Sequence, residues 1–283
     1  MPTDGSALDR SDALHKQVAR HIRNDIDAGV LRDGEVLPST RELAQRWDVS
    51  VFTITEAMKL LAEEGLVVSK SRSKRVVQAP DQPREKLRPP APHMVLIGGY
   101  AGSGKSELGR ILARETGWAI LDKDTMTRPV VEAALEVLGL SPNDRESEAY
   151  HNLIRPREYE GLMAAAHENA ASGASAVVAA PFIKEFRDAA WVERTHASFT
   201  AVGATVTLVW VYCDAESMQM YIRHRGAARD AAKLADWPSY LNTIDVDFRP
   251  AEPYVLVDNC ASGLPLQRQA RDLVAALVSR EPV

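Results

Sequence analysis

The chain has 283 residues, a length that suits two domains better than one. Its hydrophobic content of 45% and charged content of 26% are ordinary for a globular protein, and a net charge of −5 does not indicate nucleic-acid binding along the whole chain. Its two cysteines are widely spaced, which excludes a disulfide framework or a cysteine zinc site and predicts a cytoplasmic protein, and no apolar run is long enough to cross a membrane.

The N-terminal part predicts a helical domain over residues 10–79, after a polar stretch over 1–9 that is expected to be a disordered tail. Apolar residues recur at every fourth position over 14–26, which predicts an amphipathic helix. Ser39 and Glu42 then have the spacing of a capping box, which predicts that a second, short helix begins there.

A third helix and a hairpin are predicted to complete this domain. Residues 51–64 carry apolar side chains at helical spacing, and Gly65 is expected to end that helix. Two short apolar runs, 66–68 and 75–77, predict strands joined by a polar turn. Three helices followed by two strands are the elements of a winged helix-turn-helix domain.

Residues 14–78 resemble the DNA-binding domain of GntR-family transcription regulators. The matching segments are Leu37–Ala44, Val49–Ser50, Thr53–Ala57 and Leu61–Leu66. The resemblance implies a homodimer that binds a double-stranded DNA operator, with the third helix in the major groove and the hairpin, or wing, near the minor groove. The DNA contacts expected by position are Ser39, Arg41, Ser50, Thr53, Thr55, Lys70, Arg72, Lys74 and Arg75.

The chain departs from that family at positions that read DNA. Val51 and Thr55 stand where the family usually has arginine, and residues 71–73 lack the usual glycines of the wing. Arginine is the commonest reader of guanine edges, so the family's usual operator does not carry over to this chain. The basic wing predicts phosphate contacts in its place. A module that binds protein is the alternative.

A second domain is predicted after a proline-rich segment. Prolines and mixed charges over 80–93 predict a stiff, extended linker, and the second domain is expected to span 94–283. Its short apolar runs, which alternate with helical segments, are 94–97, 119–121, 176–179, 206–211 and 254–257. Such alternation predicts an α/β fold with a mostly parallel five-stranded sheet.

The most specific motif of the chain follows the first of these runs. Residues 99–106 fit G-x-x-x-x-G-K-[ST], the phosphate-binding loop, between a predicted strand and a predicted helix. Lys105 is expected to reach the β- and γ-phosphates of ATP, and Ser106 to hold Mg²⁺. The loop residues expected to bind the nucleotide are Gly99, Ala101, Gly102, Ser103, Gly104, Lys105, Ser106 and Glu107.

Charged residues follow two other predicted strands. Asp122 and Asp124 lie where ligands of open α/β sheets gather, and could orient Mg²⁺ or accept the proton of an attacking hydroxyl. The alternative is a pair of loop acids, one of which caps the next helix. Arg225 and Arg229 predict either a lid that clamps phosphates or a solvated basic helix.

Residues 94–283 resemble small P-loop kinases of the gluconate-, shikimate- and chloramphenicol-kinase type. The resemblance rests on the phosphate loop, on Leu121–Asp124 and Ala180–Phe182, and on the arginine segment. It implies that Arg225 and Asn259 lie near the nucleotide and that Ser106 and Asp124 hold the metal. The implied catalytic residues are Lys105, Asp124, Asp122, Arg225 and Arg229.

Together these features predict a GntR-like transcription regulator whose kinase-fold domain binds Mg-ATP as effector and has residues suited to phosphorylating an unidentified small molecule. The alternative is an ATP-dependent small-molecule kinase with a secondary DNA-binding domain. A third reading is an ATP sensor without phosphoryl-transfer chemistry.

Overall fold

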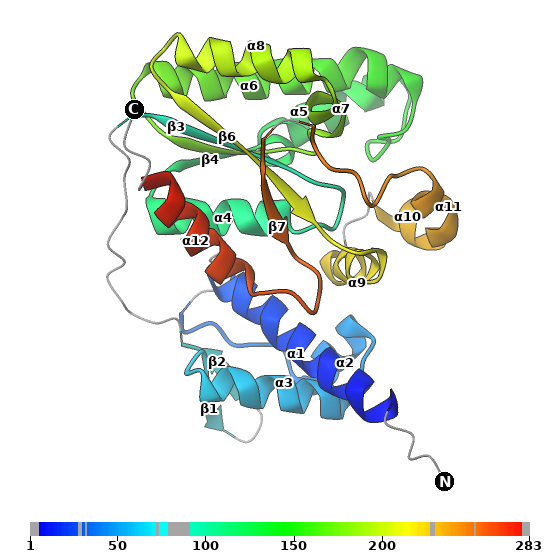
Figure 1. The fold of residues 1–283 in the computed structure, drawn as a ribbon. Coiled ribbons are helices and arrows are strands. Elements are labelled where there is room, and N and C mark those ends of the chain that lie inside the picture. The colour runs from blue at the N-terminus through cyan, green and yellow to red at the C-terminus, as the bar shows by residue number, and fades with distance from the viewer. Residues whose placement is uncertain are drawn as a thin grey trace.

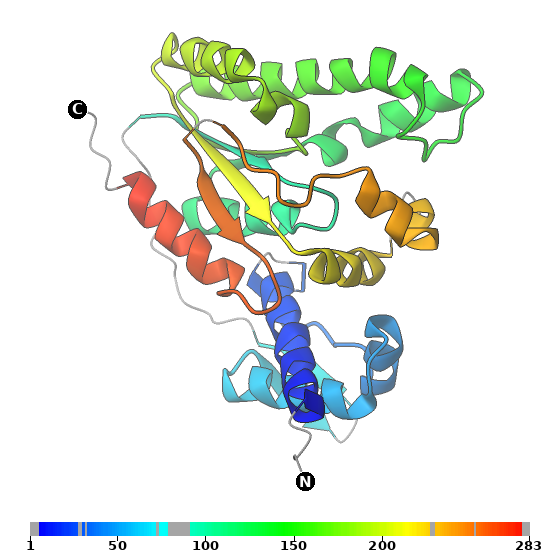
Figure 2. The ribbon, with the colours of Figure 1, turned by 45° about the vertical axis from the view of Figure 1, so that its right-hand side comes forward.

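The computed structural model describes residues 6–27, 30–31, 33–71, 74–78, 91–226, 230–251 and 253–278. An N-terminal helical domain lies below a C-terminal α/β domain in Figure 1. Helix α1 (Ser6–Asp27) starts at the far end of the N-terminal domain and runs up to the sheet domain, beside α12, in both views (Figure 1, Figure 2).

The N-terminal domain has the predicted winged helix-turn-helix elements. After α1 these are α2 (Thr40–Trp47), α3 (Val51–Glu63), β1 (Val67–Ser71) and β2 (Lys74–Val77). The capping box forms, because Ser39 accepts a hydrogen bond from the Glu42 N–H while the Glu42 carboxylate accepts one from the Ser39 N–H. Ile22 of α1 and Ile54 and Leu61 of α3 belong to the buried core of this domain.

One boundary differs from the sequence prediction, and some predictions lie outside the described residues. Helix α1 begins at Ser6, so part of the predicted tail is helical. The predicted contacts Arg72 and Arg229, and linker positions 79–90, fall outside the described set.

The C-terminal domain has the predicted five-stranded sheet, and every strand pair in it is parallel. The strands are β3 (His93–Gly98), β4 (Ala119–Asp122), β5 (Ala176–Ala179), β6 (Thr205–Tyr212) and β7 (Val255–Asp258), in the order β4-β5-β3-β6-β7. Strand β3 is central, so the segment that follows it emerges from the middle of the carboxyl edge.

Helices cover both faces of this sheet. Helices α4 (Lys105–Thr116) and α12 (Leu266–Val278) lie on one face, and α6 (Arg155–Ala171) and α8 (Ala189–Thr200) on the other (Figure 1). Alternate residues of β3 face the two layers, which is why the strand is apolar throughout.

The remaining helices are α5 (Lys123–Val137), the π-helix η1 (Tyr150–Ile154), α7 (Ile183–Arg187), α9 (Ala215–Arg225), α10 (Ala231–Ala235) and α11 (Trp237–Asn242). Across the described part of the chain, no helix combines the length and the apolar character that a membrane crossing requires.

Candidate functional site

The phosphate loop has the backbone geometry that its glycines predict. Gly102 and Gly104 have φ values of +79° and +92°, in the region that glycine adopts most readily. A Cβ atom on Gly102 would lie 2.9 Å from the carbonyl oxygen of Met218, and one on Gly104 would lie 2.2 Å from the amide nitrogen of Asn259. The loop is therefore closely surrounded and has no room for side chains at these two positions.

Polar groups of the loop suit an anionic ligand. The Ser103 hydroxyl is buried and has no hydrogen-bond partner among the described residues. Burial lowers the pKa of Lys105 and the neighbouring Arg225 lowers it further, while Asp124 and Asp122 act in the opposite direction. Two cations that share one cavity gain stability from a polyanion, so the residues present fit a polyphosphate.

The structure brings Ser106 together with one of the two predicted carboxylates. Its hydroxyl donates to Asp122 Oδ2 at 2.9 Å, and the other Asp122 oxygen accepts the Thr125 N–H at 3.0 Å as the N-cap of α5. Asp124 instead pairs with Lys123 Nζ at 3.0 Å. A hydroxyl beside a carboxylate fits Mg²⁺, which prefers oxygen ligands and keeps several waters.

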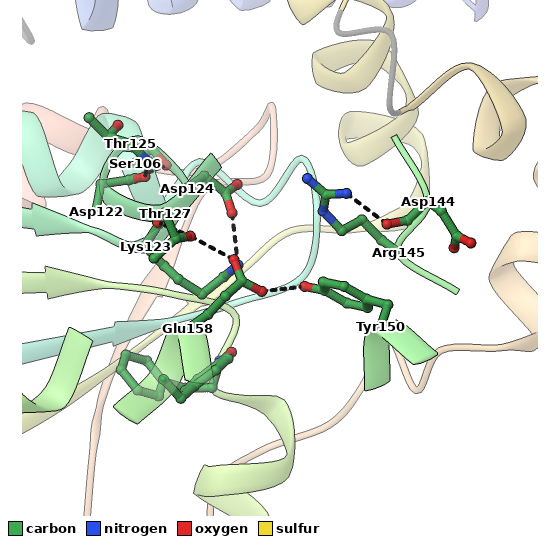
Figure 3. A network of polar contacts seen from close by, with 12 residues as sticks. Ser106, Asp122, Lys123, Asp124, Thr125, Thr127, Asp144, Arg145, Tyr150 and Glu158 are labelled. Atoms are coloured by element: carbon green, nitrogen blue, oxygen red, sulfur yellow. Dashed lines mark hydrogen bonds and ion pairs between the residues drawn. The ribbon is translucent and has the colours of Figure 1, made fainter. Parts of the chain in front are cut away.

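A buried polar network holds this corner in place (Figure 3). The Glu158 carboxylate is 4% exposed and accepts hydrogen bonds from Lys123 at 2.7 Å, Thr127 at 2.6 Å and Tyr150 at 2.7 Å. Because Lys123 also pairs with Asp124, Glu158 positions the turn that carries both aspartates. Sequence reasoning missed Glu158, because a lone glutamate on a helix carries no recognisable signal.

Both domains line the cavity beside the phosphate loop. Its C-terminal lining includes Gly102, Gly104, Lys105, Ser106, Asp122, Asp124, Arg225 and Asn259. Its N-terminal lining comes from helix α1, through His21, Asn24 and Asp25, and from Arg46 of α2. The winged helix-turn-helix domain thus forms one wall of the candidate nucleotide site, which sequence reasoning did not predict.

Arg20 of α1 fixes this arrangement. The residue is 4% exposed. Its guanidinium donates to the side-chain oxygen of Asn259 at 3.3 Å and to four backbone carbonyl oxygens, those of Cys260, Leu264, Gly263 at 2.9 Å and Asp258 at 3.3 Å. The Asn259 amide in turn donates to the Ser103 carbonyl at 3.0 Å. The predicted nucleotide-site residue Asn259 therefore joins α1 to the phosphate loop.

An aromatic cluster seals the interface beside the cavity. The His224 ring stacks on Trp47, with ring centroids 3.6 Å apart, and meets the edge of His21 at 4.3 Å. Burial lowers the pKa of His21 to about 3 and that of His224 to about 2, so both rings are neutral at physiological pH. Burial, with the nearby Glu107, raises the pKa of Asp25 to about 7.

Arg225, which also lines the cavity, forms an ion pair with Asp230. It is the last residue of α9, and Gly226 adopts the left-handed conformation as the C-cap of that helix. Its guanidinium donates to the buried Asp230 carboxylate, at 3.0 Å from Nε.

The predicted DNA contacts differ in exposure. Those that are exposed are Ser39, Arg41, Ser50, Lys70 and Lys74, whereas Thr55 and Arg75 are half-buried. Arg75 donates to the Thr40 hydroxyl at 2.7 Å. Thr53 is 6% exposed and its hydroxyl lies 2.8 Å from that of Ser50, so in this conformation it stabilises the start of α3 and has almost no surface to offer DNA.

Two family profiles match the chain, one for each domain. Residues 14–77 match the profile described as bacterial regulatory proteins of the gntR family, and residues 94–245 match an AAA domain profile. The second match covers more than half of the chain and contains the phosphate loop and both aspartates.

Curated relatives match each domain separately. A shikimate kinase from Moorella thermoacetica is 32% identical over 100 residues, which are 34% of this chain and 54% of the kinase. The HTH-type transcriptional regulator GgaR from Escherichia coli is 42% identical over 59 residues, which are 21% of this chain and 23% of the regulator. The chain thus spans about half of the first relative and about a quarter of the second.

Solved structures of small kinases align with about two thirds of the chain. A gluconokinase from Sinorhizobium meliloti has a TM-score of 0.44 at 18% identity, and the alignment covers 69% of this chain and 95% of that one. An APS kinase from Mycobacterium tuberculosis, solved with AMPPNP and APS, has a TM-score of 0.44 at 20% identity, with coverage of 68% and 100%.

Replacing Glu158 tests the buried network. Glu158→Ala leaves Lys123 with a poorer set of partners in a buried site, and we expect it to destabilise the protein by about 3 kcal/mol. For a domain of this size that is roughly 6–12 °C in Tm. Glu160→Ala, on the same helix but in an exposed pair with Arg157, should cost less than about 1 kcal/mol. Equal melting of the two variants by scanning calorimetry would contradict the assigned role of Glu158.

Proposed function

This chain belongs to the AAA-domain family through residues 94–245, and from that premise and its gntR-family domain at residues 14–77 we propose that it is a transcription regulator with Mg-ATP as effector. One observation carries the proposal: the cavity at the phosphate loop is lined by α1, a helix of the DNA-binding domain. A ligand in that cavity would therefore be in contact with the DNA-binding domain. Such a regulator would act in the cytoplasm, where DNA and ATP both occur.

Different residues of the cavity would hold different parts of a bound nucleotide. Lys105 would contact the terminal phosphates, and the loop N–H groups would hold the others. Ser106 and Asp122 would hold Mg²⁺, an assignment that the Ser106–Asp122 hydrogen bond favours over Asp124. Mg²⁺, when bound, supplies positive charge to the β- and γ-phosphates. Arg225 would exchange its bond to Asp230 for a phosphate oxygen.

The DNA-binding face lies away from the nucleotide cavity. Helix α3 and the hairpin lie on the side of α1 opposite the C-terminal domain (Figure 1). Exposed Arg41, Lys70 and Lys74 supply phosphate contacts, and Thr55 lies on the helix expected in the major groove. We propose that two copies of the chain bind an inverted repeat whose half-sites are about one helical turn apart.

A second candidate function is phosphoryl transfer to a small-molecule hydroxyl. The observation that favours it is that the cavity extends past the phosphate loop to Asp124, Thr125 and Arg128. Asp124 is 38% exposed at its side chain and would accept the proton of an attacking hydroxyl, while Arg128 would hold an anionic group of the acceptor.

Removing Lys105 tests the nucleotide site. Lys105→Ala deletes a charge from the phosphate-binding cavity, so we expect AMPPNP affinity measured by calorimetry to fall at least about tenfold. Lys184→Ala is the matched control, because it removes a lysine from the exposed surface of the same domain. Unchanged affinity in Lys105→Ala would contradict the assignment of the loop.

Variants of the wing test DNA binding. Lys70→Ala and Lys74→Ala should each reduce the log–log salt slope of binding by about 0.9, on specific and random DNA alike. Thr55→Ala should instead reduce the preference for the specific site, and Lys184→Ala should change neither quantity. The measurement is a salt series with both DNAs, with and without AMPPNP. A chain that prefers no sequence under any of these conditions would not be a regulator of this kind.

Turnover tests the second function. In a screen of hydroxylated metabolites for ADP release, an accepted substrate should be phosphorylated by the wild type, and Asp124→Asn should lose most of the kcat while keeping ATP affinity. If Asp124→Asn turned over as fast as the wild type, Asp124 would have no role in the transfer.

A further inference from the structure

A short chain of hydrogen bonds links helix α1 to the phosphate loop. Arg20 donates to the side-chain oxygen of Asn259, and the Asn259 amide donates to the carbonyl of Ser103 in the loop. Gln267 at the start of α12 donates to Asp27 at 3.0 Å, and Arg114 of α4 donates to the Ile26 carbonyl at 3.0 Å. The last two turns of α1 are therefore anchored beside the loop at several points.

Asn24 lies one helical turn beyond Arg20 and lines the cavity beside the phosphate loop. Residues four positions apart share one face of a helix, and Asn24 is among the residues that line the cavity. It is 4% exposed, and its side-chain oxygen has no hydrogen-bond partner among the described residues. A buried acceptor without a donor costs about 1–3 kcal/mol, so this position calls for a ligand that donates a hydrogen bond.

We infer that the DNA-binding domain completes the nucleotide site, with Asn24 of α1 accepting a hydrogen bond from the exocyclic amine of an adenine base. The inference rests on the proposed function, which puts the phosphates of the nucleotide in the loop. The nucleoside then extends from the loop into the part of the cavity that α1 lines. Guanine has a carbonyl oxygen where adenine has its amine, so it would place an acceptor against an acceptor.

One consequence is that the nucleotide holds the two domains together. Its phosphates are bound by the C-terminal domain and its base by the N-terminal domain, so it binds the docked arrangement better than any arrangement in which α1 has moved away. A ligand with such a differential affinity shifts the population toward the docked state. The orientation of the DNA-binding domain thereby depends on adenine nucleotide.

The affinities for three ligands distinguish the contribution of the base contact from that of the phosphate contacts. We expect the wild type to bind AMPPNP more tightly than GMPPNP, and Asn24→Ala to bind AMPPNP about tenfold more weakly while losing that preference. Inorganic tripolyphosphate, which has no base, should bind the wild type and Asn24→Ala within a factor of two. Arg23→Ala is the matched control, because Arg23 lies on the same helix but pairs with Glu64 of its own domain.

The outcomes distinguish this inference from the proposed function. If Asn24→Ala bound AMPPNP as tightly as the wild type, or more tightly, α1 would not contribute to the base site and the inference would fall while nucleotide binding stood. If the wild type bound AMPPNP and GMPPNP equally, the inference would fall without reference to any variant. If the wild type bound none of the three ligands, the proposed function would fall too.

Discussion

The burial of one cation, Arg20, determines how the two halves of this protein fit together. A guanidinium keeps its charge inside a protein and is stable there only when its N–H groups find acceptors. The last residue of β7 and the segment after it supply acceptors for the two terminal amino groups of Arg20, with four backbone carbonyls and the side chain of Asn259. Removing one partner of such a buried arrangement commonly costs about 3–5 kcal/mol. The position of α1, and with it one wall of the cavity, follows from this contact.

Local sequence patterns predicted each domain well because each depends on contacts close in the chain. The phosphate loop requires a strand, glycines and a helix in succession, and the capping box at Ser39 spans four residues. The interface between the domains had no such signal. Arg20 and its acceptors are about 240 residues apart in sequence, and Asn24 belongs to a polar stripe of α1 that is indistinguishable from a solvated helix face before the fold is known.

The sequence also predicted two carboxylates at the end of β4, and the resemblance to small kinases assigned the metal to Asp124. Only the fold shows that Asp122 turns toward Ser106 while Asp124 turns toward Lys123, because Asp122 ends β4 and caps α5 whereas Asp124 lies in the first turn of that helix. The sequence likewise did not predict that Thr53 is buried, because its burial follows from how α3 packs rather than from its place in a motif. Residue type and spacing predict which groups gather at a site, and packing decides which of them meet.

If α1 belongs to the nucleotide site as the phosphate loop does, a bound nucleotide should protect both elements. Amide hydrogen exchange with and without AMPPNP and Mg²⁺ measures both elements in one experiment on the unmodified chain. We expect peptides from residues 14–27 and from residues 99–106 both to exchange more slowly when AMPPNP is bound, because the ligand holds the two domains together. Slower exchange in the phosphate loop with unchanged or faster exchange in α1 would contradict this expectation.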